Sequence, residues 1–335
     1  MSSSLLSPTD VEEGDGSDPG AELERRAWTI SDVLHGQRLD RALAELVPEF
    51  SRSYLQQLME QGAVSMAGRT LTKASAKVKA GESGWIELRP TPQSQAFKPE
   101  AMALNVVFED EHLLVINKPA GLVVHPAPGN WSGTLLNGLL GRDPAAANLP
   151  RAGIVHRLDK DTSGLMVVAR TRTVMDKLVQ MIAARDVSRQ YVALAHKPWH
   201  GVSPRTVDAP IGRDPRNRLR MAVVDLAQHA GKASRTDVYL LETLAHGCWV
   251  RCHLHTGRTH QIRVHMASIG HPLVADELYG GASAAGMNRQ ALHACRLAFA
   301  HPVHGQEMVF EAPLPPDLRA ALLDWGLSYN RADGL

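Results

Sequence analysis

The sequence lacks the residues needed for a disulfide framework or a membrane span. Only Cys248, Cys252 and Cys295 occur among 335 residues, which predicts a reducing, cytoplasmic location. No apolar run approaches the roughly 20 residues that a membrane-spanning helix needs. The N-terminus, MSSSLLSPTD, also lacks the basic start and apolar core of a secretory signal. We therefore expect a cytoplasmic chain without a membrane partner.

Nucleotide and metal motifs are missing as well. The sequence has no G-x-x-x-x-G-K-[ST] phosphate loop, no G-x-G-x-x-G after a strand and no H-E-x-x-H. One cluster has a metal-like composition: Cys248, Cys252, His253, His255, His260 and His265. Its spacing does not match C-x-x-C zinc sites, and its alternation places neighbouring side chains on opposite strand faces. We expect no metal and no nucleotide cofactor.

The charge of the chain is unevenly distributed. Hydrophobic residues make up 44% of the chain and charged residues 21%, as in globular proteins. The net charge is +1, but residues 1–24 contain seven acidic residues and no lysine or arginine, so the rest carries +8. This basic excess is compatible with a polyanionic partner.

Composition divides the chain into five segments. Residues 1–25, rich in Ser, Gly, Asp and Glu, are expected to be a disordered acidic tail. Residues 26–89 are a small folded unit, and the proline-containing residues 90–102 are a linker. Residues 103–323 are a larger unit with a sizeable core, and residues 324–335 are a C-terminal tail.

The two folded units differ in their predicted elements. In the smaller one, helical spacing predicts a helix over 39–47, and Ser51 caps a second helix that stops at Gly62. Residues 64–66 and 78–88 follow as strands. The larger unit has an α+β pattern, with helices around 174–182 and 262–269. Its predicted strands are 104–108, 113–117, 164–170, 190–196, 236–243 and 249–255.

Two polar segments of the larger unit are candidates for chemistry. Residues 156–164 precede an apolar strand and are either an ordinary turn or a site at the rim of the core. Thr259 is expected to cap the helix that carries Arg263 in its first turn. A cation at that end of a helix needs an anionic partner, and Asp159 is a sensible one; a surface arginine is the alternative. Asp159 and Asp161 as paired glycosidase carboxylates have weak support.

Five segments, in matching order, resemble the signature segments of the RluA-type pseudouridine synthases: residues 117–126, 156–164, 189–193, 256–265 and 290–294. Residues 36–89 resemble an S4 RNA-binding domain, including Arg38-Leu39-Asp40 and Val78-x-x-Gly81-Glu82. With this unit present, the chain is most similar to the members of the family that act on the large ribosomal subunit. Two departures are a short stretch before Gln290 and Glu82 where S4 domains often have aspartate.

The resemblance implies a fold, an activity and a partner. The fold is an α+β pseudouridine synthase domain with a mixed, mostly antiparallel central sheet, joined to a small N-terminal S4 domain. The activity is isomerisation of specific uridines to pseudouridine in a stem-loop of 23S ribosomal RNA, with base flipping. The partner is 23S ribosomal RNA or the assembling large subunit, and the protein is a monomer. Isomerisation adds and removes nothing, so the reaction needs no cofactor.

The resemblance also implies roles for single residues. Asp159 is the catalytic carboxylate, either as nucleophile or as base at C2′ of the ribose, and Arg263 holds it charged. Tyr191 stacks on the uracil and assists proton removal at C5. Arg157 fills the place of the flipped base. The other predicted RNA contacts are His156 and Leu292 in the larger unit, and Arg38, Arg41, Arg52 and Lys73 in the smaller one.

Three alternatives remain open. The first is a noncatalytic RNA-binding or ribosome-assembly factor that keeps the fold. The second is a pseudouridine synthase that acts on another structured RNA, such as tRNA. The third is a metal-dependent hydrolase that uses the histidine-rich residues 253–265.

Overall fold

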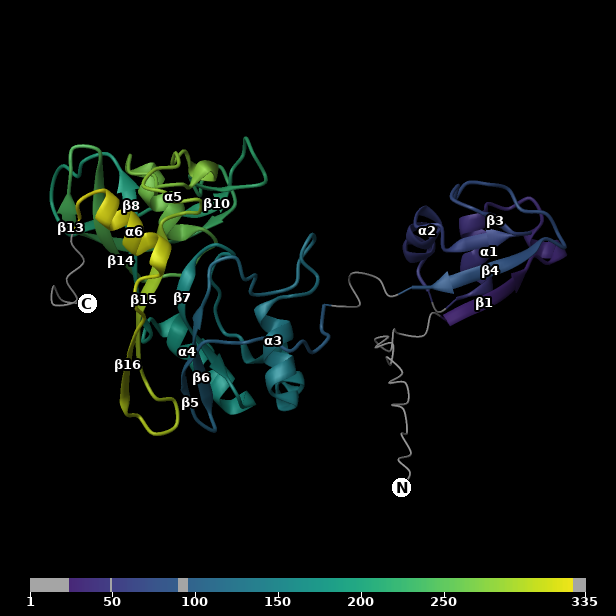
Figure 1. Ribbon diagram of the computed structural model, residues 1–335, viewed down its shortest axis with the longest axis horizontal. Helices are drawn as coiled ribbons and strands as arrows, with labels where there is room; N and C mark the ends of the chain where they lie inside the picture. Colours follow the sequence, from purple (N-terminus) through teal and green to yellow (C-terminus); the bar gives the residue numbers. More distant parts are fainter. Residues whose placement is uncertain (1–23, 49, 90–95, 328–335) are drawn as a thin grey trace, which may run out of the picture. The chain divides into compact units, whose positions relative to one another are not determined.

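The computed structural model of the chain describes residues 24–48, 50–89 and 96–327. These residues form two compact units, residues 24–89 and residues 96–327 (Figure 1). The predicted acidic tail up to residue 23, residues 90–95 of the predicted linker and the last eight residues lie outside the described part. None of the helices in the described part is both long enough and apolar enough to span a membrane.

The first unit packs two helices on a four-stranded antiparallel sheet of order β1-β4-β2-β3. Its elements are β1 (Glu24–Thr29), η1 (Asp32–Leu34), α1 (Leu39–Leu46), α2 (Arg52–Glu60), β2 (Val64–Met66), β3 (Arg69–Thr70) and β4 (Ser83–Leu88). Both predicted helices are present. The Ser51 hydroxyl accepts a hydrogen bond from the Tyr54 backbone N–H at 3.3 Å and caps α2 as expected.

Two features of this sheet differ from the sequence prediction. β1 was not predicted, because a charged start hides its alternation; it includes Glu24 and Arg25, which the sequence analysis assigned to the tail. Its cross-strand pairing is supported by an ion pair between Arg25 and Glu87. The strand predicted from residue 78 begins only at Ser83, because Gly81 has a φ of +82° and turns the backbone.

The second unit is built on a nine-stranded sheet of order β5-β6-β7-β15-β8-β14-β13-β9, with β16 also paired to β15. Its strands are β5 (Val106–Glu109), β6 (Leu113–Lys118), β7 (Ser163–Ala169), β8 (Ser188–His196), β9 (Arg205–Asp208), β13 (Arg235–Thr243), β14 (Gly247–Leu254), β15 (Leu292–Ala300) and β16 (Glu307–Glu311). β15 pairs parallel with β7, and the other pairings are antiparallel. The expected mixed, mostly antiparallel α+β architecture is confirmed.

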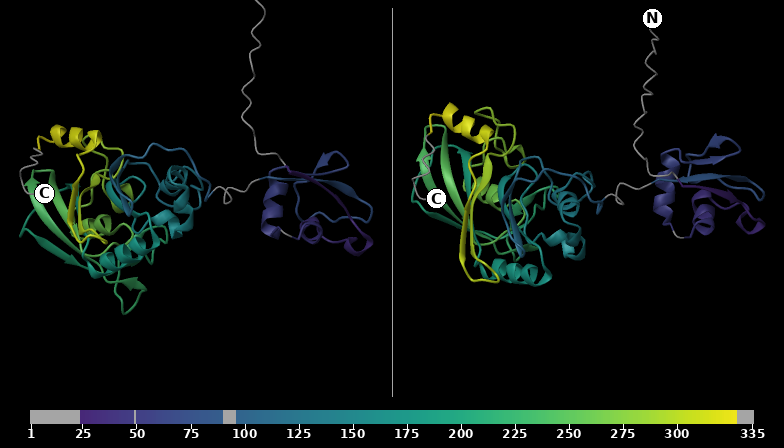
Figure 2. Two further views of the ribbon diagram at one scale, coloured as in Figure 1. Left: turned by 90° about the horizontal axis from the view of Figure 1, so that it is seen from below. Right: turned by 60° about the horizontal axis from the view of Figure 1, so that its bottom comes forward.

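Helices cover both faces of this sheet (Figures 1 and 2). The α-helices of the unit are α3 (Leu135–Arg142), α4 (Arg172–Ala184), α5 (Gln261–Ser268) and α6 (Pro316–Asp324). α3 and α5 share one apolar core with Met166 and Ala193. α4 and α6 pack on the other face of the sheet, against the alternate strand residues such as Val167 and Leu194. The sheet is therefore buried on both sides, which explains the nearly continuous apolar runs of its central strands.

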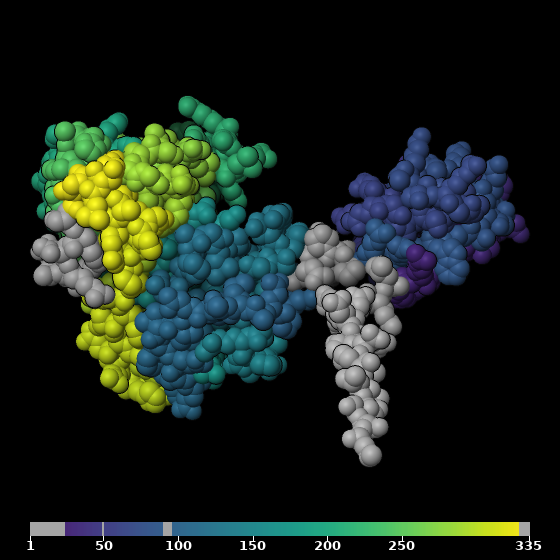
Figure 3. Space-filling model, viewed as in Figure 1, coloured from purple at the N-terminus to yellow at the C-terminus, as the bar shows by residue number. Residues whose placement is uncertain are grey.

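Short elements complete the second unit. They are η3 (Pro144–Asn148), η4 (Pro150–Gly153), η5 (Glu277–Tyr279) and the small sheet of β10 (Ile211–Arg213), β11 (Met221–Val223) and β12 (Gly231–Lys232). The C-terminal segment lies directly beside the first strands of the unit (Figure 3), where Phe310 of β16 meets Phe108 of β5 with ring centroids 5.5 Å apart. Leu327, within the predicted C-terminal tail, is buried in the α6 cluster.

Candidate active site

A cleft of about 800 Å³ opens in the second unit. It lies between the loop that precedes β7, the C-terminal end of α4, the start of β8 and the turn from β14 into α5. Its walls carry a concentration of positive charge from Arg151, Arg157, Arg185, Arg189, Arg258 and Arg263. Asp159 also lines this cleft. A concave, arginine-rich surface of this kind favours a phosphate-bearing ligand.

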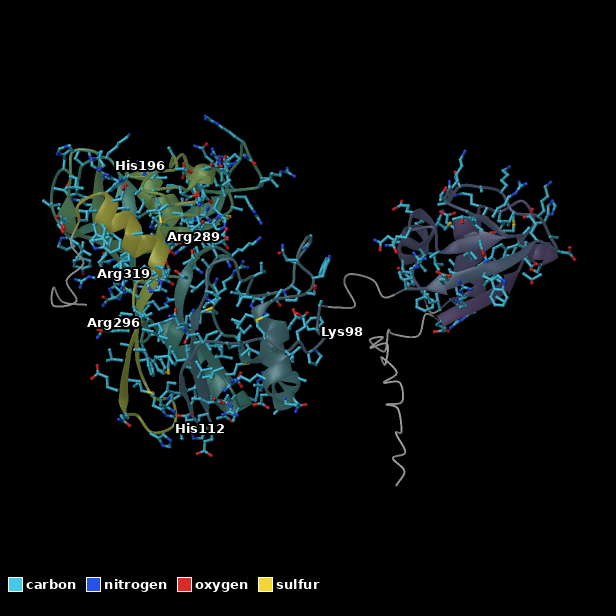
Figure 4. The ribbon with its side chains drawn as sticks, in the orientation of Figure 1. Lys98, His112, His196, Arg289, Arg296 and Arg319 are labelled. Atoms are coloured by element: carbon cyan, nitrogen blue, oxygen red, sulfur yellow. The ribbon has the colours of Figure 1, made fainter. Side chains whose placement is uncertain are left out.

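Three hydrogen bonds fix the loop that carries Asp159, one within the loop and two from other segments. The backbone N–H of Thr162 donates to the Asp159 carbonyl at 3.1 Å and closes a turn. The Lys118 ammonium donates to the Lys160 carbonyl at 2.9 Å. The guanidinium of Arg289, labelled in Figure 4, donates to the Asp161 carbonyl at 2.8 Å. The position of the Asp159 backbone is therefore set by residues from β6 and from the segment before β15.

Lys118 is almost completely buried, which is unusual for a lysine. Its ammonium donates to the carbonyls of Pro119, Leu122 and Lys160 at 2.8 to 2.9 Å, so all three N–H groups have an acceptor. Burial lowers its pKa to about 7, against the opposing effect of Asp161 and Asp159. The side chain joins the end of β6 to the loop of Asp159.

Arg263 lies between two carboxylates. Its Nη1 donates to Oδ2 of Asp159 at 3.2 Å, and its Nε and Nη2 donate to both carboxylate oxygens of Asp276 at 2.8 Å. Burial acts to lower the pKa of Arg263, but Asp276 and Asp159 outweigh it and raise the pKa. The side chain of Asp276 is fully buried, whereas that of Asp159 is 17% exposed. The partner that the sequence predicted for Arg263 is therefore in contact with it.

His260 completes the surroundings of Asp159. Its Nε2 is 3.8 Å from Oδ1 of Asp159, and its Nδ1 is 2.8 Å from the Tyr279 hydroxyl. Burial lowers the pKa of His260, although Asp159 opposes the effect. The N-cap of α5 is His260, with a φ of +55°, and no side chain caps the helix. The prediction that Thr259 caps this helix is therefore wrong. The N-cap position falls one residue after Thr259, at His260, whose backbone is left-handed.

Tyr191 and Leu292 belong to the floor of the cleft. Both are buried in the core that α3 and α5 share, and both line the cleft. Burial raises the pKa of Tyr191 to about 12; Arg189 opposes this shift and Asp159 adds to it. The phenol is therefore protonated at neutral pH. Cross-strand pairing of β8 with β15 brings the two side chains into one region.

The two predicted contacts next to Asp159 have different environments. Arg157 is exposed on the wall of the cleft. His156 also lines the cleft, but its Nε2 accepts a hydrogen bond from the Val167 backbone N–H at 3.1 Å. Burial first, and Arg189 second, lower the pKa of His156 to about 3. The ring is neutral at pH 7, so it offers no charge to a phosphate.

The predicted RNA contacts of the first unit surround a buried carboxylate or lie on its surface. Arg38 and Arg52 donate to the carboxylate oxygens of Asp40 at 3.1 Å and 2.7 Å, and each of these arginines is 49% exposed. The exposed Arg41 is 3.8 Å from Glu45, and Lys73 is exposed. Arg38 and Arg52 therefore have a structural contact in addition to any contact with RNA.

The metal-like cluster of the sequence separates in the fold. Cys248 and Cys252 are buried on one face of β14, and His253 and His255 lie on the other, as the alternation predicted. His265 bonds to Thr236 and Ala209.

Sequence reasoning missed Asp276, His260, Lys118 and Arg289 as parts of this site. A signal was available for two of them, since His260 and Lys118 fall inside segments that carried the family resemblance. Asp276 follows an apolar strand-like run, and the sequence analysis did not weigh the acidic group there as a partner for Arg263.

The fold and the cleft define an RNA-modifying enzyme, and comparison with known proteins agrees. Residues 112–268 match the model of the RNA pseudouridylate synthase family, and residues 37–83 match the S4 domain. The chain belongs to the RNA pseudouridine synthase family and is an isomerase of that class. The predicted resemblance to the RluA-type enzymes is confirmed.

Several relatives are proteins named ribosomal large subunit pseudouridine synthase D. The one from Neisseria meningitidis serogroup B is 47% identical over 89% of this chain and 81% of the relative. The one from Nitrosomonas europaea is 48% identical over 88% and 86%, and the one from Escherichia coli O6:H1 is 45% identical over 87% and 91%. A solved structure, human RNA pseudouridylate synthase domain containing 1, has a TM-score of 0.52 at 28% identity, covering 67% of this chain and 90% of the other.

Proposed function

We propose that this chain converts specific uridines of 23S ribosomal RNA, in a stem-loop, to pseudouridine. The names of its relatives and the presence of an S4 domain support this substrate. The observation that carries the proposal is the contact of 3.2 Å between Asp159 and Arg263 inside an arginine-lined cleft. The protein acts in the cytoplasm as a monomer, on ribosomal RNA or on the assembling large subunit.

The carboxylate of Asp159 is the proposed catalytic group. The reaction breaks the bond between N1 of the uracil and C1′ of the ribose, turns the base and joins C5 to C1′. A carboxylate beside the sugar serves either as nucleophile or as base at C2′. The guanidinium of Arg263 stabilises its negative charge in a partly desolvated cleft, where one hydrogen-bonded charge pair is worth more than in water.

The remaining residues of the cleft hold and turn the base. Tyr191 presents an aromatic ring for stacking. Its phenol assists the loss of the C5 proton at the end of the reaction as a relay, because its oxygen accepts that proton while its own hydroxyl proton passes to water in the cleft. Leu292 packs on the base beside it. A uridine in a stem is unreachable unless it flips out, at a cost of a few kcal/mol, and Arg157 fills the place that it vacates. His156, Arg38, Arg41, Arg52 and Lys73 contribute further to RNA binding.

The test is direct modification of ribosomal RNA. Purified full-length protein is incubated with 23S ribosomal RNA from cells that lack the gene, and pseudouridines are mapped before and after. We expect new pseudouridines at a few defined uridines of a stem-loop, and none in tRNA treated in parallel. Identical maps before and after treatment would remove the substrate assignment, and modification of tRNA instead would support the alternative substrate.

A further inference from the structure

Two histidines and one aspartate gather on the face of the sheet opposite the buried cysteines. His253 is on β14, and His255 directly follows its last residue, where the backbone N–H of His255 still donates to the Arg235 carbonyl at 3.2 Å. The two side chains, two residues apart, therefore leave the backbone on the same face. Asp237 of the neighbouring strand β13 pairs directly with His253 in the register of the sheet. Two histidines at this spacing and one aspartate from the adjacent strand therefore bring three side chains together on one face of the sheet.

The ligand atoms of these three residues are close together. One nitrogen of each histidine and one carboxylate oxygen of Asp237 lie within 4.8 Å of one another. Nε2 of His255 is 2.6 Å from Oδ2 of Asp237, and the two imidazole rings have centroids 4.9 Å apart. All three residues are at most partly exposed, Asp237 least of all.

We propose that Asp237, His253 and His255 form a binding site for a divalent transition metal ion of the zinc type. Two imidazoles and one carboxylate are a donor set that zinc prefers, with bonds of about 2.0 to 2.2 Å. A tetrahedral arrangement at that bond length places ligand atoms about 3.4 Å apart. Small side-chain rotations from the present separation reach this spacing. Three protein ligands leave the fourth position to a water molecule.

A neighbouring hydroxyl already orients the carboxylate. The Thr206 hydroxyl donates to Oδ1 of Asp237 at 2.7 Å, which leaves Oδ2 directed to His255. The metal would occupy the place of the proton between Oδ2 and Nε2. Such outer partners fix the orientation of ligating carboxylates in metal sites. His255 also lines the cleft, so the site adjoins the cleft wall at this residue. The proposed chemistry of Asp159 assigns no role to any of the three ligands.

A second group of histidines lacks these properties and provides a control. His112, labelled in Figure 4, lies near His301 and His304. Both nitrogens of His301 have partners: Nδ1 accepts from the backbone N–H groups of Val303 and His304, and Nε2 is 3.0 Å from Asp110. His301 therefore has no lone pair directed to a metal, although the three rings are just as crowded.

The test measures zinc binding to the untagged full-length protein after dialysis against a chelator. Isothermal titration with zinc chloride should show one ion bound per chain, and Co²⁺ should give the visible absorption bands of a tetrahedral site. His255→Ala and Asp237→Asn should each weaken zinc at least about tenfold, the loss typical of an outer partner alone. His304→Ala should bind zinc like the wild type.

Three results would overturn the site. They are no zinc bound to the wild type, unchanged affinity in both His255→Ala and Asp237→Asn, or an equal loss in His304→Ala. Circular dichroism of each variant establishes that it is folded. Should Asp237→Asn fail to fold, His253→Ala replaces it, since this partly exposed ring makes a long 3.5 Å contact with the Ser188 hydroxyl and lies beside the His255 ring.

Discussion

Each unit of the protein contains an aspartate held by arginine, and the two clusters have opposite burial. In the first unit Asp40 is completely buried, and its partners Arg38 and Arg52 are half exposed. In the second unit Arg263 is buried, and its partner Asp159 faces a cleft. The first arrangement uses its carboxylate to hold two helices together. The second leaves carboxylate oxygen accessible to a ligand.

The comparison shows why an Asp–Arg contact alone does not identify an active site. Hydrogen bonds from Arg38 first, and also from Arg52 and Gln56, hold the pKa of Asp40 far below its usual range, against the effect of burial. Both of its carboxylate oxygens accept hydrogen bonds from side chains of the protein. At Asp159 a second carboxylate, Asp276, takes two of the hydrogen bonds of Arg263, and only one goes to Asp159.

Among the variants that leave Asp159 in place, removing the anchor of Arg263 should have the largest effect on turnover. Asp276→Asn replaces an acceptor of two hydrogen bonds, so the guanidinium shifts away from Asp159. Misplacement of about 1 Å near a reacting centre costs about 10²-fold in rate. We expect single-turnover pseudouridine formation to fall by about that factor, with RNA affinity nearly unchanged. A parallel loss of RNA affinity would show that Asp276 supports the whole cleft instead.

Asp40→Asn should affect stability rather than turnover. Loss of charge-assisted hydrogen bonds to a buried group lowers the free energy of local opening by about 2 kcal/mol. Hydrogen exchange should increase in peptides from residues 24–89 and not in those from residues 96–327. Faster exchange in both units alike would contradict the local role of Asp40.

The stabilisation of the first unit by Asp40 should depend on pH, and the direction of this dependence follows from the lowered pKa. Because the folded pKa of Asp40 is lowered, its stabilisation is complete above the unfolded pKa near 3.9 and is lost as the pH falls below that value. The wild type should therefore lose protection of residues 24–89 on acidification below about pH 4, and Asp40→Asn should lose much less. Equal acid sensitivity of the two proteins would assign the effect to other groups.

Arg157→Ala should have an intermediate effect on turnover. Without a side chain to fill the place of the flipped base, the extruded state loses part of its stabilisation. We expect about a tenfold slower single-turnover rate at saturating RNA, since 1.4 kcal/mol corresponds to tenfold. Arg319→Ala on α6 is the matched control, because this exposed arginine (Figure 4) lies on a helix that packs on the other face of the sheet. The same loss of rate in both variants would show that Arg157 contributes only its positive charge and does not fill the place of the flipped base.

The smallest effect is expected at the surface of the first unit. Lys73 is exposed, so Lys73→Gln should weaken RNA binding only a few-fold and lower the slope of log affinity against log salt by about one. Turnover at saturating RNA should not change. A salt slope equal to that of the wild type would show that Lys73 does not contact phosphate.

Much of the fold could be predicted from local patterns. Apolar runs predicted most of the central strands, and Ser51 marked the start of α2, because these signals act over a few residues. The central strand β15 and the helix α3 were not predicted. β1 and α6 were missed. The charged start of β1 is stabilised by pairing with β4, and α6 by packing on the sheet, and neither partner is visible locally.

The site was predictable only in part. Asp159, Arg263 and Tyr191 were named because motif resemblance singled them out, and the contact of Asp159 with Arg263 followed from a charge argument. Asp276 could not be found this way, since its role depends on a turn that brings it back to α5. The contacts of an arginine also depend on tertiary packing. Arg38 and Arg52 were therefore predicted only as RNA contacts, and their hydrogen bonds to the buried Asp40 were not predicted.

The central claim is that the carboxylate facing the cleft performs the chemistry. The most direct test measures single-turnover pseudouridine formation at saturating RNA for Asp159→Asn and Asp40→Asn side by side, with RNA affinity determined for each. We predict that Asp159→Asn loses at least about 10³-fold in rate while still binding RNA, and that Asp40→Asn stays within about threefold of the wild type. A rate for Asp159→Asn close to that of the wild type would contradict the account.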